Sequence, residues 1–305
     1  MIYNNEKIVS VGKGSPLTLS WELVTHCQFK CSYCYFNPYE SSTNYSEVMK
    51  IVLTKIKNIK EPVEMTLLGG EPTLHPEFHH LIKSLYEMNH VTKIDVITNF
   101  QPTVEFWRPL LPYKDKIEIV LSYHVEYSQK NFFKKIEALK NDFNMNIIFL
   151  VHNELKYLSK LKEAADKYFE LGLETLPITF AKLVDRSSGS AEYFEYQAET
   201  LSFLSEQEKR VKRLKYPEVI PVTTEAGTKI EINQMEFSSK NMNRFKGWKC
   251  QMNALIIHPD GMVSYPCTNQ KKHILFAELG KRNLVCAHEI CPCEAYWNFT
   301  KTKNS

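Results

Sequence analysis

The sequence has no long hydrophobic run and no excess of charge of one sign. No window approaches the roughly 20 consecutive apolar residues that a membrane helix needs, and the N-terminal segment MIYNNEKIVSVGKG has no apolar stretch after its charged residues. The 38 Lys and Arg residues are balanced by 35 Asp and Glu residues, so the chain has no basic stripe of the kind that binds nucleic acid. These absences predict a cytoplasmic protein with no membrane or nucleic-acid partner.

Cysteine is absent from residues 35–249, and its eight copies fall into two groups on either side of that gap. Three lie at positions 27, 31 and 34, and the other five lie between positions 250 and 293. A chain without a secretory signal is expected in a reducing compartment, where thiols stay available as ligands. The cysteines therefore predict metal binding or catalysis rather than a disulfide framework.

The chain also lacks internal repeats and low-complexity segments. Its 43% hydrophobic and 24% charged residues are close to the averages of globular proteins. A length of 305 residues suffices for one large α/β domain with an appendage, or for two ordinary domains.

The first part of the chain alternates between strand-like and helix-like segments. The predicted strands are residues 17–24, 63–69, 93–99, 116–124, 146–152 and 174–180. The predicted helices are residues 44–59, 76–89, 103–111, 130–142 and 154–171. This alternation indicates a parallel sheet, open or curled into a barrel, with functional residues at the carboxyl ends of its strands.

The alternation stops after residue 181. A polar segment, DRSSGSAEY, is followed by a charged helix at 198–215 and by two hairpin patterns, VTTEAGTKIEIN and ALIIHPDGMVSYPC. In the second hairpin, Asp260-Gly261 between apolar runs is a strong signal for a tight turn. We therefore divide the chain into an α/β domain at 1–185, a connector at 186–240 and a cysteine-bearing C-terminal domain at 241–305.

The first cysteine group is the run CQFKCSYC, which places Cys27, Cys31 and Cys34 on one short loop. A cubane iron-sulfur cluster has four irons, each of which normally takes one cysteine. Three cysteines leave one iron open to bind another molecule. The alternative is a structural zinc site, for which only the adjacent His26 offers a fourth ligand.

A second motif follows the second predicted strand, in the segment LLGGEPTLHPEF. Paired glycines such as Gly69 and Gly70 let a backbone approach another group closely, and a carboxylate such as Glu71 accepts hydrogen bonds from an ammonium group. The alternative is an ordinary glycine turn after a strand.

Together, the cysteine loop with Tyr33 before its last cysteine and the GGEP element one β/α unit later resemble the radical S-adenosylmethionine (SAM) superfamily. The resemblance implies a partial (β/α)6 TIM-like barrel with a 4Fe-4S cluster on Cys27, Cys31 and Cys34. It also implies that the open iron chelates the amino and carboxylate groups of SAM, whose reductive cleavage yields a 5'-deoxyadenosyl radical that removes a hydrogen atom. Gly69, Gly70, Glu71 and Pro72 match the methionine-binding segment of the family.

The resemblance implies further cofactor-binding positions at strand ends. They are Thr98, Asn99, Ser122, His124 and Asn153. Phe100 stands where relatives often have glycine after Thr-Asn, which puts a close backbone approach in doubt. As an alternative, these polar residues cap strand ends locally.

The segment GWKCQMNALIIHPDGMVSYPC resembles the opening of a SPASM or Twitch module, which carries auxiliary clusters in many relatives. Five cysteines are too few for two clusters at about four thiolates each, so the resemblance implies one auxiliary 4Fe-4S cluster. The expected ligands are Cys250, Cys267, Cys291 and Cys293. Cys286 is the alternate ligand, or else a thiol that donates a hydrogen atom to a substrate radical. A structural zinc site on the same thiolates is the alternative.

The function that the resemblance implies is hydrogen abstraction from a small sugar-like or aminocyclitol-like molecule, leading to epimerisation or dehydrogenation. An external electron donor such as flavodoxin or ferredoxin is expected as a partner. Only about 16 residues precede the first predicted strand, so we do not expect a fused peptide-recognition domain of ordinary size. Modification of a ribosomally made peptide and a zinc-binding interaction protein without enzymatic activity are the two alternatives.

Overall fold

The structure is a computed structural model of the 305-residue chain. It describes residues 2–3, 6–12, 14–34, 36, 43–127, 131–185, 192–211, 219–233, 236–237, 240–265, 271–291 and 299–303. Across these ranges, no helix is both long and apolar enough to cross a membrane.

A nine-stranded sheet forms the larger part of the molecule. Six of its strands are parallel and neighbour one another in chain order: β3 (Leu17–Glu22), β4 (Val63–Leu68), β5 (Val91–Thr98), β6 (Ile117–His124), β7 (Asn144–Val151) and β8 (Ile178–Lys182). These are the six predicted strands, shifted by a few residues at their ends. The α/β class with a parallel sheet is therefore confirmed.

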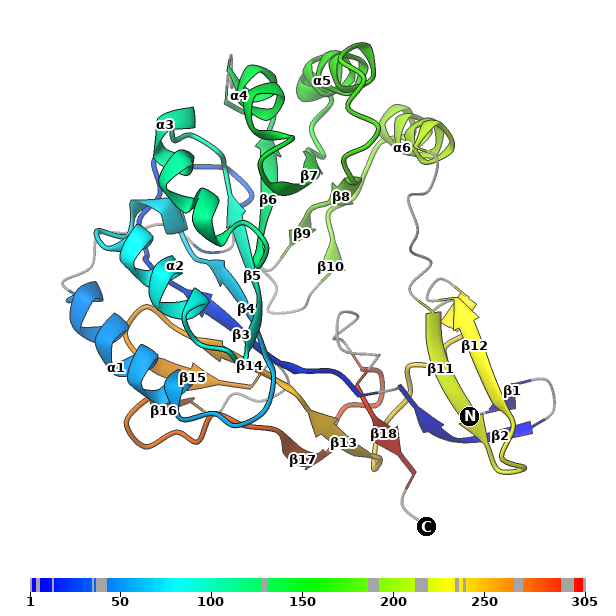
Figure 1. Ribbon diagram of the computed structural model, residues 1–305. Helices are drawn as coiled ribbons and strands as arrows, with labels where there is room; N and C mark the ends of the chain where they lie inside the picture. Colours follow the sequence, from blue (N-terminus) through cyan, green and yellow to red (C-terminus); the bar gives the residue numbers. More distant parts are fainter. Residues whose placement is uncertain are drawn as a thin grey trace.

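The helices between these strands lie together on one side of the sheet (Figure 1). They are α1 (Tyr45–Lys57), α2 (Phe78–Tyr86), α3 (Val104–Trp107), α4 (Phe132–Leu139) and α5 (Leu158–Glu170), with short 3-10 turns at Pro72–Leu74, Arg108–Tyr113 and Leu155–Tyr157. Helix α1 begins where the Asn44 side chain accepts a hydrogen bond from the Glu47 backbone N–H (3.2 Å), an ordinary N-cap. Helix α6 (Ala198–Arg210) follows the short strands β9 (Val184–Asp185) and β10 (Glu192–Tyr193).

The two faces of the sheet differ in burial. Along β3 and β4 every second residue is buried, and the residues between them are half-buried. The buried set, which includes Leu19 and Met65, belongs to the same hydrophobic core as the helix residues Val52 and Leu81. Because side chains alternate along a strand, the opposite, half-buried face is the inner face of the partial barrel. We call it the inner face below.

The sheet continues at its β3 edge with residues from the C-terminal part of the chain. Strand β14 (Ala254–Ile257) pairs parallel with β3, and β15 (Met262–Ser264) and β16 (Lys271–His273) follow it in antiparallel order. The β14–β15 pair is the predicted hairpin, and Gly261 in its turn has a φ of 78°, which glycine adopts without steric cost. The sequence did not predict the pairing with β3, because a contact between residues this far apart leaves no local pattern.

A second sheet joins both ends of the chain (Figure 1, lower right). Its order is β12 (Lys229–Asn233), β11 (Val219–Thr224), β2 (Glu6–Val11), β18 (Lys301–Thr302), β13 (Lys249–Met252) and β17 (Arg282–Val285), with β1 (Ile2–Tyr3) beside β2. The β11–β12 pair is the first predicted hairpin. Strands β1 and β2 precede residue 17, where the sequence placed the first strand, so the N-terminal segment belongs to the second sheet rather than only leading into the barrel.

Candidate active site

The cysteine loop begins directly after β3, at the carboxyl edge of the parallel sheet. The GGEP segment holds its first residues: the Gly70 backbone N–H donates to Val24 O (2.9 Å), and the Glu71 backbone N–H donates to His26 O (2.9 Å). A Cβ added at Gly70 would lie 2.1 Å from His26 O, far inside van der Waals contact. The missing side chain at Gly70 therefore lets the cysteine loop lie against the end of β4.

The Glu71 side chain is buried, with an exposed fraction of 1%. Its Oε1 accepts hydrogen bonds from Thr73 Oγ1 (2.6 Å), the Thr73 backbone N–H (3.2 Å) and Thr98 Oγ1 (2.7 Å), while Oε2 accepts from the Asn99 backbone N–H (2.8 Å). Burial raises the pKa of Glu71, and these hydrogen bonds act in the opposite direction. Both carboxylate oxygens are thus engaged in tying the end of β4 to the end of β5.

Asn99 connects this carboxylate to the first cysteine. Its side-chain Nδ2 donates to Cys27 Sγ (3.6 Å), and its Oδ1 accepts from Gln28 Nε2 (3.1 Å). The Phe29 backbone N–H also donates to Cys27 Sγ (3.4 Å). A path of hydrogen bonds therefore runs from Glu71 through Asn99 to Cys27.

Phe100 has a φ of 57°, a conformation that favours glycine and costs a side-chain-bearing residue roughly 1–2 kcal/mol. The Phe100 ring is buried and lies near the rings of Trp107 and Phe132, which offsets this cost. Lys135 Nζ donates to Phe100 O, to Gln101 O (3.2 Å) and to Pro102 O (3.1 Å), and burial lowers the pKa of Lys135 to about 8. The backbone after Asn99 thus keeps a glycine-like turn despite the substitution.

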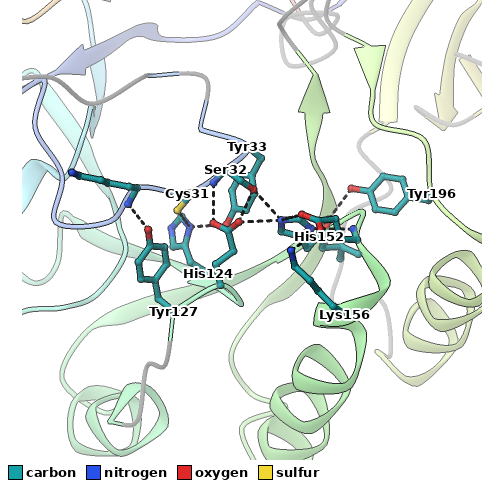
Figure 2. Close-up of polar contacts among 12 residues, drawn as sticks. Cys31, Ser32, Tyr33, His124, Tyr127, His152, Lys156 and Tyr196 are labelled. Atoms are coloured by element: carbon teal, nitrogen blue, oxygen red, sulfur yellow. Dashed lines mark hydrogen bonds and ion pairs between the residues drawn. The ribbon is translucent and has the colours of Figure 1, made fainter.

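His124, at the end of β6, contacts the middle of the cysteine loop (Figure 2). Its Nδ1 lies 3.3 Å from Cys31 Sγ and 2.9 Å from the Tyr33 hydroxyl. Burial lowers the pKa of His124 to about 4, so the ring is neutral at pH 7. Burial also raises the pKa of Cys31 to about 12 and that of Cys27 in the same direction.

Two residues that the sequence reasoning missed fasten the loop between Cys31 and Cys34. Glu126 accepts hydrogen bonds from Ser32 Oγ (2.5 Å) and the Ser32 backbone N–H (2.9 Å). His152 Nε2 lies 3.2 Å from both Ser32 Oγ and Glu126 Oε1, and Figure 2 shows His152 joined to Ser32. His152 directly follows β7 and Glu126 lies two residues after the end of β6, and this position near a strand end is the only signal the sequence gave for them. They hold the loop across the carboxyl edge of the sheet.

The remaining predicted positions lie nearby. Ser122 is buried on β6, two residues before His124 and on the same face, and Asn153 is half-buried directly after His152. The Cys34 backbone N–H donates to Cys31 O (3.1 Å), which closes a turn at the end of the cysteine motif. In the described ranges no three His, Cys, Asp or Glu side chains converge on one metal ion. A cubane cluster binds each cysteine thiolate through a different iron, so its ligands do not converge on a single ion.

The C-terminal cysteines lie mainly in the second sheet. Cys250 is buried on β13, Cys291 is buried in a hydrophobic cluster beside that sheet, and Cys286 is partly buried against the same cluster. Cys286 follows β17, and its backbone N–H donates to Trp248 O (2.9 Å). Cys267 and Cys293 lie outside the described residues.

Residues 21–208 match the family model described as the Radical SAM superfamily. GTP 3',8-cyclase from Microcystis aeruginosa is 28% identical over 85 residues, which make up 25% of this chain and 25% of the cyclase. Among solved structures, Streptococcus suis SuiB bound to precursor peptide SuiA aligns with a TM-score of 0.57 and 19% identity, over 87% of this chain and 63% of SuiB. The structure of anSMEcpe with bound AdoMet and Cp18Cys peptide aligns with a TM-score of 0.52 and 17% identity, over 90% of this chain and 79% of anSMEcpe. The chain thus spans a quarter of the cyclase and under two thirds of SuiB, and the structural likeness establishes the fold.

Proposed function

The chain belongs to the radical SAM superfamily, and from that premise we propose that Cys27, Cys31 and Cys34 hold a 4Fe-4S cluster whose fourth iron binds SAM. Members of this family are SAM-dependent enzymes, so family membership replaces the interpretation as a zinc-binding interaction protein. The observation that carries the proposal is the cysteine loop itself, with three thiols at the carboxyl edge of a parallel sheet and its backbone held by Gly70, Glu71 and Glu126. When bound, the cluster and SAM together supply the radical that removes a hydrogen atom from the substrate.

The residues of the chain fit such a cluster by donor chemistry and by support. The donors are thiols, which are the usual ligands of iron-sulfur clusters. Cys27 Sγ accepts hydrogen bonds from the Asn99 side chain and the Phe29 backbone N–H. Hydrogen bonds to the sulfurs of a cluster tune the reduction potential of that cluster. We propose that the thiols of Cys27 and Cys31, whose pKa values burial raises, lose their protons when the cluster binds.

We propose that the strand-end residues border the cofactor. Tyr33, Gly69, Gly70, Glu71 and Pro72 form one side through the cysteine loop and the GGEP segment. The other side is formed by the ends of β5, β6 and β7, with Thr98, Asn99, Ser122, His124 and Asn153. Within this set, Glu71 acts by positioning, because its carboxylate oxygens bind Thr73, Thr98 and Asn99.

A small polar molecule, sugar-like or aminocyclitol-like, is the substrate we propose, with epimerisation or dehydrogenation as the outcome. The inner face supports this choice because it is polar: Ser122 and His124 lie on it at the end of β6. Nearer the start of the strands, Lys93 Nζ lies 2.9 Å from Asp95 Oδ1 and 2.6 Å from Glu118 Oε2. Such a face suits a hydroxylated or aminated ligand better than an apolar one. An external one-electron donor such as flavodoxin or ferredoxin completes the proposed reaction.

A peptide substrate is the second candidate. It is favoured by the fold likeness to SuiB, whose structure contains precursor peptide SuiA, and to anSMEcpe, whose structure contains the Cp18Cys peptide. Product analysis in deuterated solvent separates the two proposed outcomes on either substrate. Epimerisation through a thiol places solvent deuterium on carbon, and dehydrogenation places none.

We also propose one auxiliary cluster on Cys250, Cys267, Cys291 and Cys293. Cys286 is the alternate ligand, and it packs against the same hydrophobic cluster that contains Cys291, which favours that role over hydrogen donation to a substrate at the barrel. Iron analysis tests this: two clusters predict about eight irons per chain, and one predicts about four. About four irons together with one zinc would favour a structural zinc site on these thiolates.

The proposed function is tested by measuring 5'-deoxyadenosine after anaerobic reconstitution, reduction and addition of SAM. The wild-type protein should form this product. The triple variant Cys27→Ala, Cys31→Ala and Cys34→Ala should form none, whereas Lys50→Ala, on the exposed side of α1, should match the wild type. Product formation by the triple variant would show that the site lies elsewhere.

A further inference from the structure

Glu22, His258 and Ser264 form a continuous hydrogen-bonded chain outside the residues assigned above. His258 Nδ1 lies 2.8 Å from Glu22 Oε2, and His258 Nε2 lies 2.8 Å from Ser264 Oγ. The three residues come from three neighbouring strands: Glu22 ends β3, His258 follows β14 and Ser264 ends β15. We call this set the Glu–His–Ser chain.

The strand register explains why these residues meet. Ile257 on β14 is paired with Trp21 on β3, so the next residue on each strand brings His258 beside Glu22. The hairpin then returns through Gly261, and Ser264 pairs with Ile256, which places Ser264 on the same face as His258. The His258 backbone N–H donates to Met262 O (2.7 Å) and fixes the start of the turn.

One arrangement of protons satisfies both hydrogen bonds of the chain when Glu22 is a carboxylate. A carboxylate accepts hydrogen bonds, so Glu22 holds the His258 proton on Nδ1. The other ring nitrogen, Nε2, is then an acceptor for the Ser264 hydroxyl proton. This is the order of groups that activates a serine hydroxyl in acyl-transfer enzymes, and here it lies in a different fold.

The chain faces the inner side of the sheet. Glu22 belongs to the half-buried set of β3, with Thr18 and Ser20, rather than to the set packed against the helices. The side chains of His258 and Glu22 have exposed fractions of 17% and 14%, and Ser264 is 7% exposed. Ser264 therefore presents a nearly buried hydroxyl to the inner face, one residue pair below the carboxyl ends of β3 and β14. The cysteine loop follows β3 at this same edge.

We propose that the Glu–His–Ser chain is a proton relay that activates the Ser264 hydroxyl and binds an alcohol hydroxyl of the substrate. When the bound hydroxyl gives its proton to Ser264 Oγ, the Ser264 proton passes to His258 Nε2. The electron pair of the broken bond stays on the ligand oxygen, and Glu22 stabilises the imidazolium that results. The choice of an alcohol as ligand rests on the proposed function, whereas the relay itself does not.

A purely structural role would use the same three residues to fasten the β14–β15 hairpin to β3. The two roles differ in chemical reactivity: a fastening serine is inert, and a relay serine is nucleophilic. Ser20 offers a reference on the same face, because it is half-buried on β3 and forms no such hydrogen-bonded chain within the described part of the protein.

The test is the rate at which methanesulfonyl fluoride, a small reagent, sulfonylates Ser264 in the reconstituted protein, read by peptide mass spectrometry. In this reaction the Oγ–S bond forms, fluoride leaves with the S–F electron pair and the hydroxyl proton goes to His258 Nε2. We expect Ser264 to react faster than Ser20. His258→Gln should slow the labelling by about 100-fold or more, the usual contribution of a general base, and Glu22→Gln should slow it by about tenfold or more by the same reasoning.

Each variant is checked for iron content and melting temperature, so that a folding defect is recognised, and Glu22→Gln serves if His258→Gln does not fold. Equal labelling of Ser264 and Ser20 in the wild type, or unchanged labelling in a folded His258→Gln or Glu22→Gln protein, would overturn the relay. The reaction needs neither reductant nor SAM, so its failure is distinct from failure of the proposed radical function.

The ligand class is tested by protection of Ser264 from the same reagent. Slower labelling in the presence of myo-inositol would identify a small polyol. Slower labelling with acetyl-Gly-Ser-Gly-amide but not with acetyl-Gly-Ala-Gly-amide would identify a peptide hydroxyl. Labelling that none of these saturating probes slows would refute the alcohol subsite.

Discussion

Replacing Glu71 by Gln turns one carboxylate oxygen into an amide NH2 and leaves the shape of the side chain unaltered. The wild-type Oε1 accepts three hydrogen bonds from Thr73 and Thr98, and Oε2 accepts one from the Asn99 backbone N–H. A Gln in the better orientation keeps its oxygen at the position of Oε1 and points its NH2 at the Asn99 N–H. One buried donor then loses its acceptor.

An unsatisfied buried group of this kind costs about 1–3 kcal/mol. A loss of about 2 kcal/mol corresponds to a fall in melting temperature of roughly 4–8 °C for a domain of about 200 residues. Because Asn99 also binds Cys27 Sγ, we expect Glu71→Gln to form 5'-deoxyadenosine more slowly as well. The assays are thermal unfolding by circular dichroism and product analysis on the same anaerobic preparation.

Glu87→Gln is the matched control, because Glu87 is exposed at the end of α2 and pairs only with Lys83 among the ion pairs observed in the described chain. Its effect on stability should stay within about 0.5 kcal/mol. Burial raises the pKa of Glu71, so the alternative to test is a protonated carboxyl group at this position. A Glu71→Gln protein that melts with the wild type would show that Glu71 is protonated in the fold and that the carboxylate reasoning is wrong.

Three further perturbations test the support of the cysteine loop. Gly70→Ala places a Cβ 2.1 Å from His26 O, so it should displace the loop and lower the iron content after reconstitution; full iron content would contradict this. Glu126→Ala removes both carboxylate oxygens that accept hydrogen bonds from Ser32 and should speed the loss of iron to a chelator, with Glu137→Ala as the exposed control. Burial raises the pKa of Cys31 from 9.0 to about 12. Below that value, each unit by which the pH is raised increases the Cys31 thiolate fraction roughly tenfold. The initial rate of cluster uptake should therefore rise between about pH 7 and 9, and a flat profile would refute it. The same shift makes the cluster-free fold lose stability as the pH rises through 9, where the unfolded thiol ionises and the folded one does not.

The parallel sheet was predictable because each strand carries its own signal. The runs at 63–69 and 116–124 are rich in apolar and β-branched residues, and turn residues separate them from helical patterns. The structure places β4 and β6 within these runs. The partners of β14 were not predictable, because the parallel register of β14 with β3 depends on residues more than two hundred positions apart.

The same division holds for the candidate site. Cys27, Cys31, Cys34 and the GGEP segment form local motifs, and their order along the chain suffices to indicate the family. The roles of individual residues did not follow from the motifs. The sequence suggested that Glu71 meets a ligand, and the structure engages both of its oxygens with Thr73, Thr98 and Asn99.

Contacts between strand ends were the part of the site that the sequence could predict least. Glu126 and His152 reach Ser32 only because β6 and β7 end at the same edge of the sheet. His258 reaches Glu22 for a similar reason. Such residues have no spacing of their own in the sequence, so only the packed sheet identifies them.

The central claim is that one iron of the cluster on the cysteine loop carries no protein ligand and binds SAM. The most direct measurement is the electron paramagnetic resonance spectrum of the reduced protein before and after addition of SAM. The measurement uses a Cys250→Ala variant, which reduces the signal of the proposed auxiliary cluster. Its spectrum should shift on addition of SAM. A spectrum that SAM leaves unchanged would mean that a side chain closes the fourth position, and it would contradict the account.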